Sequence, residues 1–153
     1  MTPIGRGKPV ADLQLHQPVY VSLTTTSSRI RSVAGTITDI LKGSIIPTHI
    51  FLFVSNDKFL DDKGVQKNVL PQSLQDLAAT QPFTIVFTKN IGPHRRLLPL
   101  LSKFWKTDCV IIAIDDDRSS DYNTHVVEKL LRYYIHSGKS AVVALKVRAE
   151  AII

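Results

Sequence analysis

The sequence predicts an α/β domain, a three-layer sandwich built on a mainly parallel, Rossmann-like sheet. Two observations lead to this fold class. Short apolar runs alternate with amphipathic segments along the 153 residues, and such alternation favours a parallel sheet. In addition, residues 110–114 are apolar at every position and stop at three aspartates, Asp115, Asp116 and Asp117. A short, uninterrupted apolar run of this kind is typical of a strand buried on both faces.

Five apolar runs, each bounded by turn-forming or polar residues, predict the strands. In chain order they cover residues 18–23, 48–54, 83–87, 110–114 and 141–147. The first run ends in a hydroxyl-rich loop over residues 24–28, and the second ends at Ser55-Asn56-Asp57. Because parallel strands share a direction, these loops and the three aspartates should open at one edge of the sheet.

The first two helices are predicted between the first three strands. Apolar residues recur at helical spacing over residues 30–41, and Gly43 provides a stop signal. The polar stretch 58–68 indicates an irregular loop, which a short helix follows near residues 71–79.

The last two helices flank the aspartate-ended strand. An amphipathic segment over residues 97–104 contains Pro99, so this helix must begin late or be kinked. The final helix can be capped by Ser120 or Asp121 and stops at Gly138.

Length and composition fit one folded unit, with 44% hydrophobic and 21% charged residues. We expect a flexible N-terminal tail over residues 1–16, one α/β domain over 17–148 and a C-terminal stub over 149–153. No apolar stretch approaches the roughly 20 residues of a membrane span, so we expect no transmembrane segment. The compartment stays open: the cytoplasm is the default, and the lumen of the Golgi or ER would require an N-terminal anchor outside this sequence.

Three adjacent carboxylates repel one another, and the repulsion needs an offset. Solvent, a helix N-terminus or a hard divalent cation can supply it. Two interpretations remain open here. The aspartates can form an acidic turn in which one of them caps the next helix, or they can belong to a ligand site beyond the strand ends.

The positive charge favours an anionic partner. The chain has a formal charge of +6, and a cluster containing His94, Arg95 and Arg96 precedes the aspartates. The same residues also fit the solvated face of a helix. Two further residues, Asp61 and Asp62, are expected to be a solvated pair in the loop 58–68.

These features together predict a site for a metal-bound nucleoside diphosphate. Hydroxyl and backbone groups suit a base and ribose, guanidinium groups suit phosphate oxygens, and carboxylates suit a divalent cation. The candidate binding residues are Thr24, Thr25, Arg29, Asn56, Arg95, Arg96, Asp115 and Asp116.

Five segments also occur in a characteristic order. They are Ser22-Leu23-Thr24 followed by Ser28-Arg29-Ile30; Pro47 to Leu52 with Ser55; Leu70-Pro71-Gln72-Ser73-Leu74; Gly92 to Pro99; and the aspartate triplet. With these segments, which span about residues 19–147, the chain resembles the nucleotide-diphospho-sugar transferases, the glycosyltransferases of the A-type fold with an Asp-x-Asp motif. One departure is Arg96, near which the family commonly has a lysine.

The resemblance implies hexosyl transfer from a metal-bound nucleotide-diphospho-sugar donor to a glycan or another hydroxyl acceptor. By this likeness the α/β domain over residues 17–148 binds the nucleotide-sugar. Asp115 lies near the ribose or sugar, Asp117 and Asp115 bind Mn²⁺ or Mg²⁺, and Arg95 or Arg96 holds the diphosphate. In such enzymes the acceptor site, and often the catalytic base, lie further along the chain. We therefore assign no catalytic residue and expect this chain to be the donor-binding half, with the C-terminal part of the fold missing.

Two other classes of protein share some of these features. A non-catalytic nucleotide- or RNA-binding α/β module would use the basic face. Such a module would not need three carboxylates in its groove unless it also bound a metal. Proteins that bind single-stranded nucleic acid usually have aromatic residues among the basic ones, and Arg95 and Arg96 have none interleaved near them. We therefore expect no nucleic acid partner. A phospho-acceptor receiver domain gathers aspartates from different strands, whereas the first strand here ends in Thr24-Thr25-Thr26.

Overall fold

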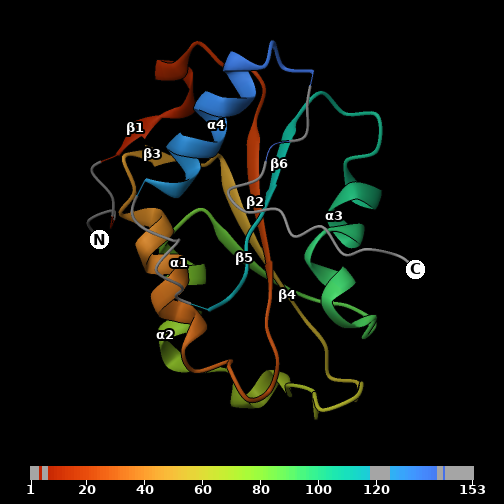
Figure 1. The fold of residues 1–153 in the computed structure, drawn as a ribbon. Coiled ribbons are helices and arrows are strands. Elements are labelled where there is room, and N and C mark those ends of the chain that lie inside the picture. Colours follow the sequence, from red (N-terminus) through yellow and green to blue (C-terminus); the bar gives the residue numbers. More distant parts are fainter. Residues whose placement is uncertain (1–3, 5–6, 118–124, 141–142, 144–153) are drawn as a thin grey trace.

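The computed structural model describes residues 4, 7–117, 125–140 and 143 (Figure 1). It is an α/β structure with two parallel sheets: a four-stranded sheet in the order β5-β4-β2-β6 and a two-stranded sheet of β1 and β3. The strands are β1 (Lys8–Pro9), β2 (Val19–Thr24), β3 (Ile45–Ile46), β4 (His49–Val54), β5 (Phe83–Phe87) and β6 (Val110–Ala113). This arrangement is compatible with a Rossmann-like fold.

The described residues form four α-helices and three short 3-10 helices. The α-helices are α1 (Val33–Leu41), α2 (Gln72–Thr80), α3 (Leu98–Lys103) and α4 (Val126–His136). The 3-10 helices are η1 (Val10–Leu13), η2 (Lys67–Val69) and η3 (Gly92–Arg96). Among the helices of the described residues, none has the length and apolar character that a membrane crossing requires.

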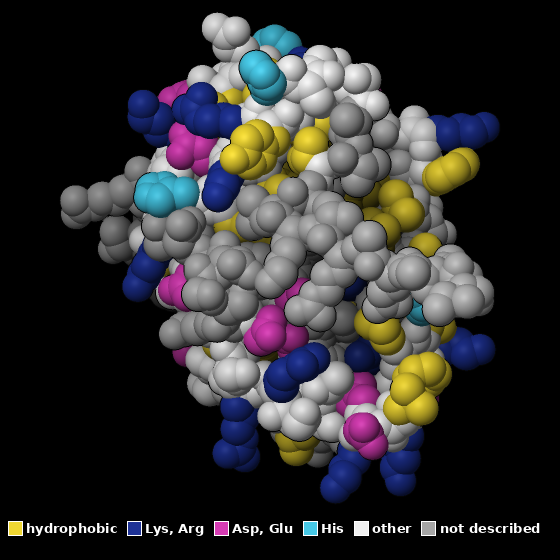
Figure 2. Space-filling model, viewed as in Figure 1, with side chains coloured by type: hydrophobic (Ala, Val, Ile, Leu, Met, Phe, Trp, Pro, Cys, Tyr) yellow, Lys and Arg dark blue, Asp and Glu magenta, His cyan; other side chains and the backbone are white. Residues whose placement is uncertain are grey.

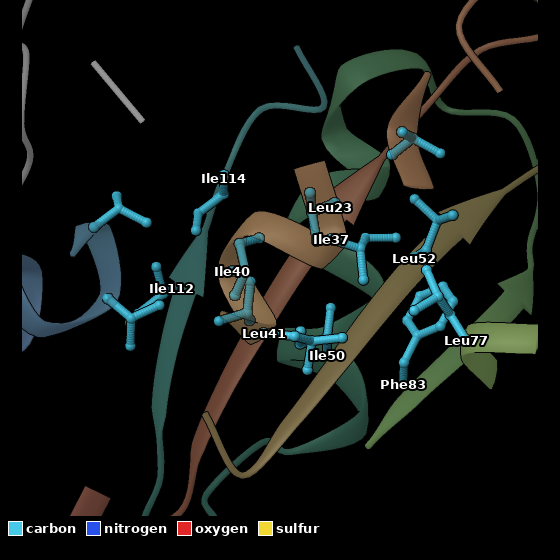
Figure 3. Close-up of a cluster of buried hydrophobic side chains, with 14 of the residues drawn as sticks. Leu23, Ile37, Ile40, Leu41, Ile50, Leu52, Leu77, Phe83, Ile112 and Ile114 are labelled. Atoms are coloured by element: carbon cyan, nitrogen blue, oxygen red, sulfur yellow. The ribbon is translucent and has the colours of Figure 1, made fainter. Parts of the chain in front are cut away.

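Helices cover both faces of the larger sheet. In Figure 1, α1 and α2 lie on one side of the strands and α3 lies on the other. The larger apolar cluster joins β2, β4 and β6 to α1, and Figure 3 shows Leu23, Ile50 and Ile112 facing Ile37 and Ile40 within it. Helix α4 adds three buried residues to this cluster, namely Val126, Val127 and Leu131. Burying each such side chain contributes about 1.5–3 kcal/mol.

The opposite face carries a smaller, aromatic cluster. Phe51 and Phe53 of β4 pack with the fully buried Leu100 of α3. At its edge, the rings of Tyr20 and Phe104 stack with centroids 4.3 Å apart. This cluster fixes α3 on the sheet, and with it the 3-10 helix η3 that precedes α3 in the chain.

Four predicted strands are confirmed to within one residue at each end. They are β2, β4, β5 and β6. Pro99 lies in the first turn of α3, where a proline removes no intrahelical hydrogen bond, so the prediction that this helix begins late is also confirmed. The expected strand over residues 141–147 and the expected caps Ser120 and Asp121 fall outside the described residues, apart from residue 143.

The N-terminal segment differs from the expected loose tail over residues 1–16. Lys8 and Pro9 pair in parallel with Ile45 and Ile46. Apolar residues that follow this pairing hold the segment against the core. Val10 and Leu15 belong to the larger core cluster, and Leu15 is only 2% exposed. The partly buried Ile4 also packs against this cluster, so packed residues occur well ahead of the first predicted strand.

Candidate functional site

A pocket of about 260 Å³ opens at the carboxyl ends of the parallel strands. Its walls come from the ends of β2 and β6 and from the loops that follow β4 and β5. The lining residues are Thr24, Thr26, Arg29, Phe59, Leu60, Asp61, Asp62, Asn90, Gly92, Pro93, Arg95, Arg96, Ile114, Asp115 and Asp116. Figure 2 shows acidic and basic side chains beside one another on this face of the molecule, toward the end where these loops lie in Figure 1. The position is the one at which open α/β sheets bind ligands.

The structure brings six of the eight candidate binding residues to this pocket. They are Thr24, Arg29, Arg95, Arg96, Asp115 and Asp116. Thr25 is buried behind the lining, at 1% exposure. Asn56 and Asp117 are exposed and lie outside the lining.

Asp116 ties the end of β6 to the loop after β2. Its carboxylate accepts hydrogen bonds from the Thr25 hydroxyl at 2.7 Å and from Arg29 Nε at 2.9 Å. Its backbone carbonyl accepts one from the Thr36 hydroxyl of α1 at 2.9 Å. Asp116 is only 5% exposed, whereas a solvated acidic turn would leave its carboxylates in water. This residue therefore has internal partners that hold the pocket floor together.

Asp115 pairs with Arg96 across the pocket. Arg96 Nη1 donates to Asp115 Oδ1, and the Arg96 carbonyl accepts a hydrogen bond from the Ser22 hydroxyl of β2. The two charged side chains are 38% and 53% exposed. Exposed pairs of this kind contribute about 0–1 kcal/mol, so a ligand can rearrange this one at small cost.

Arg95 is the most unusual residue of the pocket, because a complete guanidinium group is buried there at 1% exposure. Its Nη2 atom donates to the Thr25 carbonyl and to Asp62 Oδ2, both at 3.1 Å. Its Nε and Nη1 atoms are buried without a hydrogen-bond partner among the described residues. Each unsatisfied buried donor costs about 1–3 kcal/mol, and more for a charged group.

Asp62 is not the solvated residue that we expected, since it is 8% exposed. It accepts backbone hydrogen bonds from Ser27 at 3.0 Å and Gly64 at 3.1 Å, and side-chain hydrogen bonds from Asn90 and Arg95, both at 3.1 Å. Burial alone would raise the pKa of Asp62, but the donors at Ser27, Gly64 and Asn90 hold that pKa below its usual value. The only feature of the sequence that could have indicated this turn around Asp62 is the nearby Gly64, which allows the chain to turn tightly.

An apolar rim borders the charged part of the pocket. Phe59 is 39% exposed and Leu60 is 89% exposed. The Phe59 ring approaches the backbone of Gly92, where an added Cβ would lie 2.8 Å from the ring atom Cε1. Gly92 also has a φ of +65°, so glycine is favoured at this position for two independent reasons. The sequence does not indicate this rim, because the loop that carries Phe59 and Leu60 has no regular periodicity.

The carboxylates of the pocket could serve as ligands for a divalent cation. Within the described part of the chain, no three His, Cys, Asp or Glu side chains gather into a ready-made metal cluster. Mg²⁺ usually takes only one or two carboxylates and completes its shell with water and substrate phosphates. Asp115, at the pocket wall, fits that smaller role; Asp117 is exposed and lies two residues further along the chain.

Comparison of the chain with protein-family models, with curated proteins and with solved structures gave no match.

Proposed function

We propose that this protein is a glycosyltransferase of the nucleotide-diphospho-sugar transferase type, which binds its donor in the pocket at the carboxyl ends of β2 and β6. The observation that carries the proposal is Arg95. A buried cation with unused N–H donors, in a residue that lines a pocket, calls for an anionic oxygen close by. Guanidinium groups bind diphosphate oxygens through paired hydrogen bonds, which is why arginine suits this role.

The other lining residues fit the remaining parts of such a donor. Arg29 and Arg96 add two guanidinium groups beside Arg95. The hydroxyls of Thr24 and Thr26 suit a ribose, and the apolar rim suits the face of a base or sugar ring. The segment order described for the sequence supports the same class of donor. The acceptor is a glycan or another hydroxyl compound, and no residue is assigned as catalytic base.

A divalent cation completes the proposed donor complex. Among the described residues, the lining holds four carboxylates, Asp61, Asp62, Asp115 and Asp116, against three guanidinium groups, which leaves one negative charge in excess. A bare diphosphate would add to that excess. Mn²⁺ or Mg²⁺ held by Asp115, with Asp117 as a second carboxylate, would offset the charge and stabilise the nucleoside diphosphate as a leaving group.

Calorimetric titration with UDP and with GDP, in the presence of Mn²⁺, tests this proposal. We expect at least one of the two to bind, and chelation of the metal to abolish that binding. Replacing Arg95 by glutamine should weaken binding about tenfold or more, because a charged hydrogen bond is lost.

Arg31→Gln is the matched control, since Arg31 is exposed and lies outside the pocket lining. Its affinity should match that of the wild type. Failure of both nucleotides to bind would refute the donor proposal, and equal binding without metal would refute the role of the cation. Metal-independent binding of RNA in place of nucleotide would favour the non-catalytic module.

A further inference from the structure

One buried carboxylate joins the loops that form the pocket. Asp62 Oδ1 accepts from the backbone of Ser27, in the loop after β2, and from Gly64 in its own loop. Asp62 Oδ2 accepts from Asn90, after β5, and from Arg95 in η3. Both oxygens are therefore in use, and segments 28 to 35 residues away in the sequence meet at this one side chain.

The contact with Asp62 determines how the Arg95 guanidinium is oriented. This group is planar and carries five N–H donors in fixed directions. Asp62 and the Thr25 carbonyl both accept from Nη2, so they fix the plane and leave Nε and Nη1 for another partner. A long, flexible side chain held in this way loses little further freedom when an anion binds.

We propose that Asp62 is a positioning residue: it holds Arg95 in the orientation that binds the anionic group of the ligand. The inference rests on the proposed function, because the anion is taken to be the diphosphate of the donor. Asp62 acts through Arg95. Its carboxylate supplies a counter-charge that offsets the cost of burying the Arg95 guanidinium. It also orients this group so that Nε and Nη1 remain available to the ligand.

The first test measures the affinity for inorganic pyrophosphate with Mg²⁺ by calorimetry. Asp62→Asn keeps the shape of the side chain but removes its charge and presents N–H groups to Arg95 or Ser27. We expect about tenfold weaker binding, the loss typical of one charged hydrogen bond. Asp76→Asn is the matched control, since Asp76 is an exposed aspartate on α2 that lies outside the pocket lining; its affinity should stay within about twofold of the wild type.

A double-mutant cycle separates positioning from general loosening of the loops. In an Arg95→Gln background, Asp62→Asn should change the affinity by less than about twofold, because its effect passes through Arg95. An equal loss in both backgrounds would overturn the proposal. Asn90→Ala provides a second control: it removes a loop contact to Asp62 but leaves the Asp62–Arg95 pair, so it should weaken pyrophosphate binding much less than Asp62→Asn does.

A measurement on the wild type covers the case in which Asp62→Asn does not fold. Nitrogen-15 NMR should show separate, slowly exchanging Nη1 and Nη2 signals for Arg95, since a held guanidinium cannot rotate freely. A single averaged signal would overturn the proposal. If the wild type binds neither pyrophosphate nor nucleotide, the proposed function and the positioning role both fail. If it binds, and Asp62→Asn binds equally well, only the positioning role fails.

Discussion

Gly64 and Gly138 show how one residue type can have different structural importance. Both have a left-handed backbone, with φ of +81° and +73°. A Cβ at Gly64 would lie 2.4 Å from the carbonyl oxygen of Asn56, whereas a Cβ at Gly138 would meet no atom of the described residues within 4 Å. Gly64 also donates its N–H to Asp62. The backbone at Gly64 therefore has both a conformational and a steric need for glycine.

We predict that Gly64→Ala lowers the free energy of unfolding by about 3 kcal/mol, because the left-handed conformation and the short contact both act against the methyl group. Gly138→Ala meets only the conformational cost and should lower it by about 1 kcal/mol. Urea denaturation of the two variants beside the wild type measures the difference. Equal losses would show that the loop around Gly64 adjusts without strain.

The two neighbouring aspartates show the limit of sequence reasoning at the residue scale. Asp61 and Asp62 have the same chemistry and the same local sequence, and we expected both to be solvated. Asp62 is buried because Ser27, Asn90 and Arg95 reach it from other parts of the chain. Those contacts depend on how three loops meet, so no local pattern could indicate them. Candidates at strand ends, such as Asp115, were easier to place because the sheet itself brings strand ends together.

At the scale of elements, apolar runs located the larger strands to within one residue. The expectation that residues 110–114 form a strand buried on both faces is wrong, because β6 lies at the edge of the described sheet and its Ala113 is exposed. The short pairing of β1 with β3 was missed because two residues carry no periodicity. Helix α3 is the element that links packing to the pocket. It follows η3 directly, and its Leu100 is completely buried between the sheet and the helix.

We predict that Leu100→Ala lowers the free energy of unfolding by about 3 kcal/mol, because it leaves a cavity in the aromatic cluster. Leu98→Ala, in the same helix, is the matched control: Leu98 is 50% exposed, and its loss should cost less than about 1 kcal/mol. Thermal or urea unfolding compares the two. A small effect at Leu100 would mean that α3 contributes little to the stability of the sheet and does not fix η3.

At the scale of the whole molecule, the charge of the pocket is opposite in sign to the net charge of the chain. The chain carries +6, yet the described residues of the pocket lining include one more carboxylate than guanidinium groups. The basic cluster before β6 does not form an open cationic surface, because Arg95 is buried and Arg96 pairs with Asp115. The positive excess therefore lies mainly outside the pocket, and a diphosphate entering it gains little from the net charge of the protein.

This distribution predicts that a nucleoside diphosphate and a divalent cation assist each other's binding. Linkage requires that Mn²⁺ raise the affinity for the nucleotide by the same factor by which the nucleotide raises the affinity for Mn²⁺. We expect a factor of about ten or more, the size typical of such coupling.

Asp115→Asn should reduce the factor, because it removes the carboxylate proposed to hold the cation. Asp76→Asn is the control, since Asp76 lies on α2 and accepts a hydrogen bond from Gln72, away from the pocket. Calorimetric titration of each ligand in the presence and absence of the other, corrected for their association in solution, gives both factors. A factor near one in the wild type would mean that the three arginines bind the diphosphate unaided, and that the carboxylates of the pocket serve only to position those arginines.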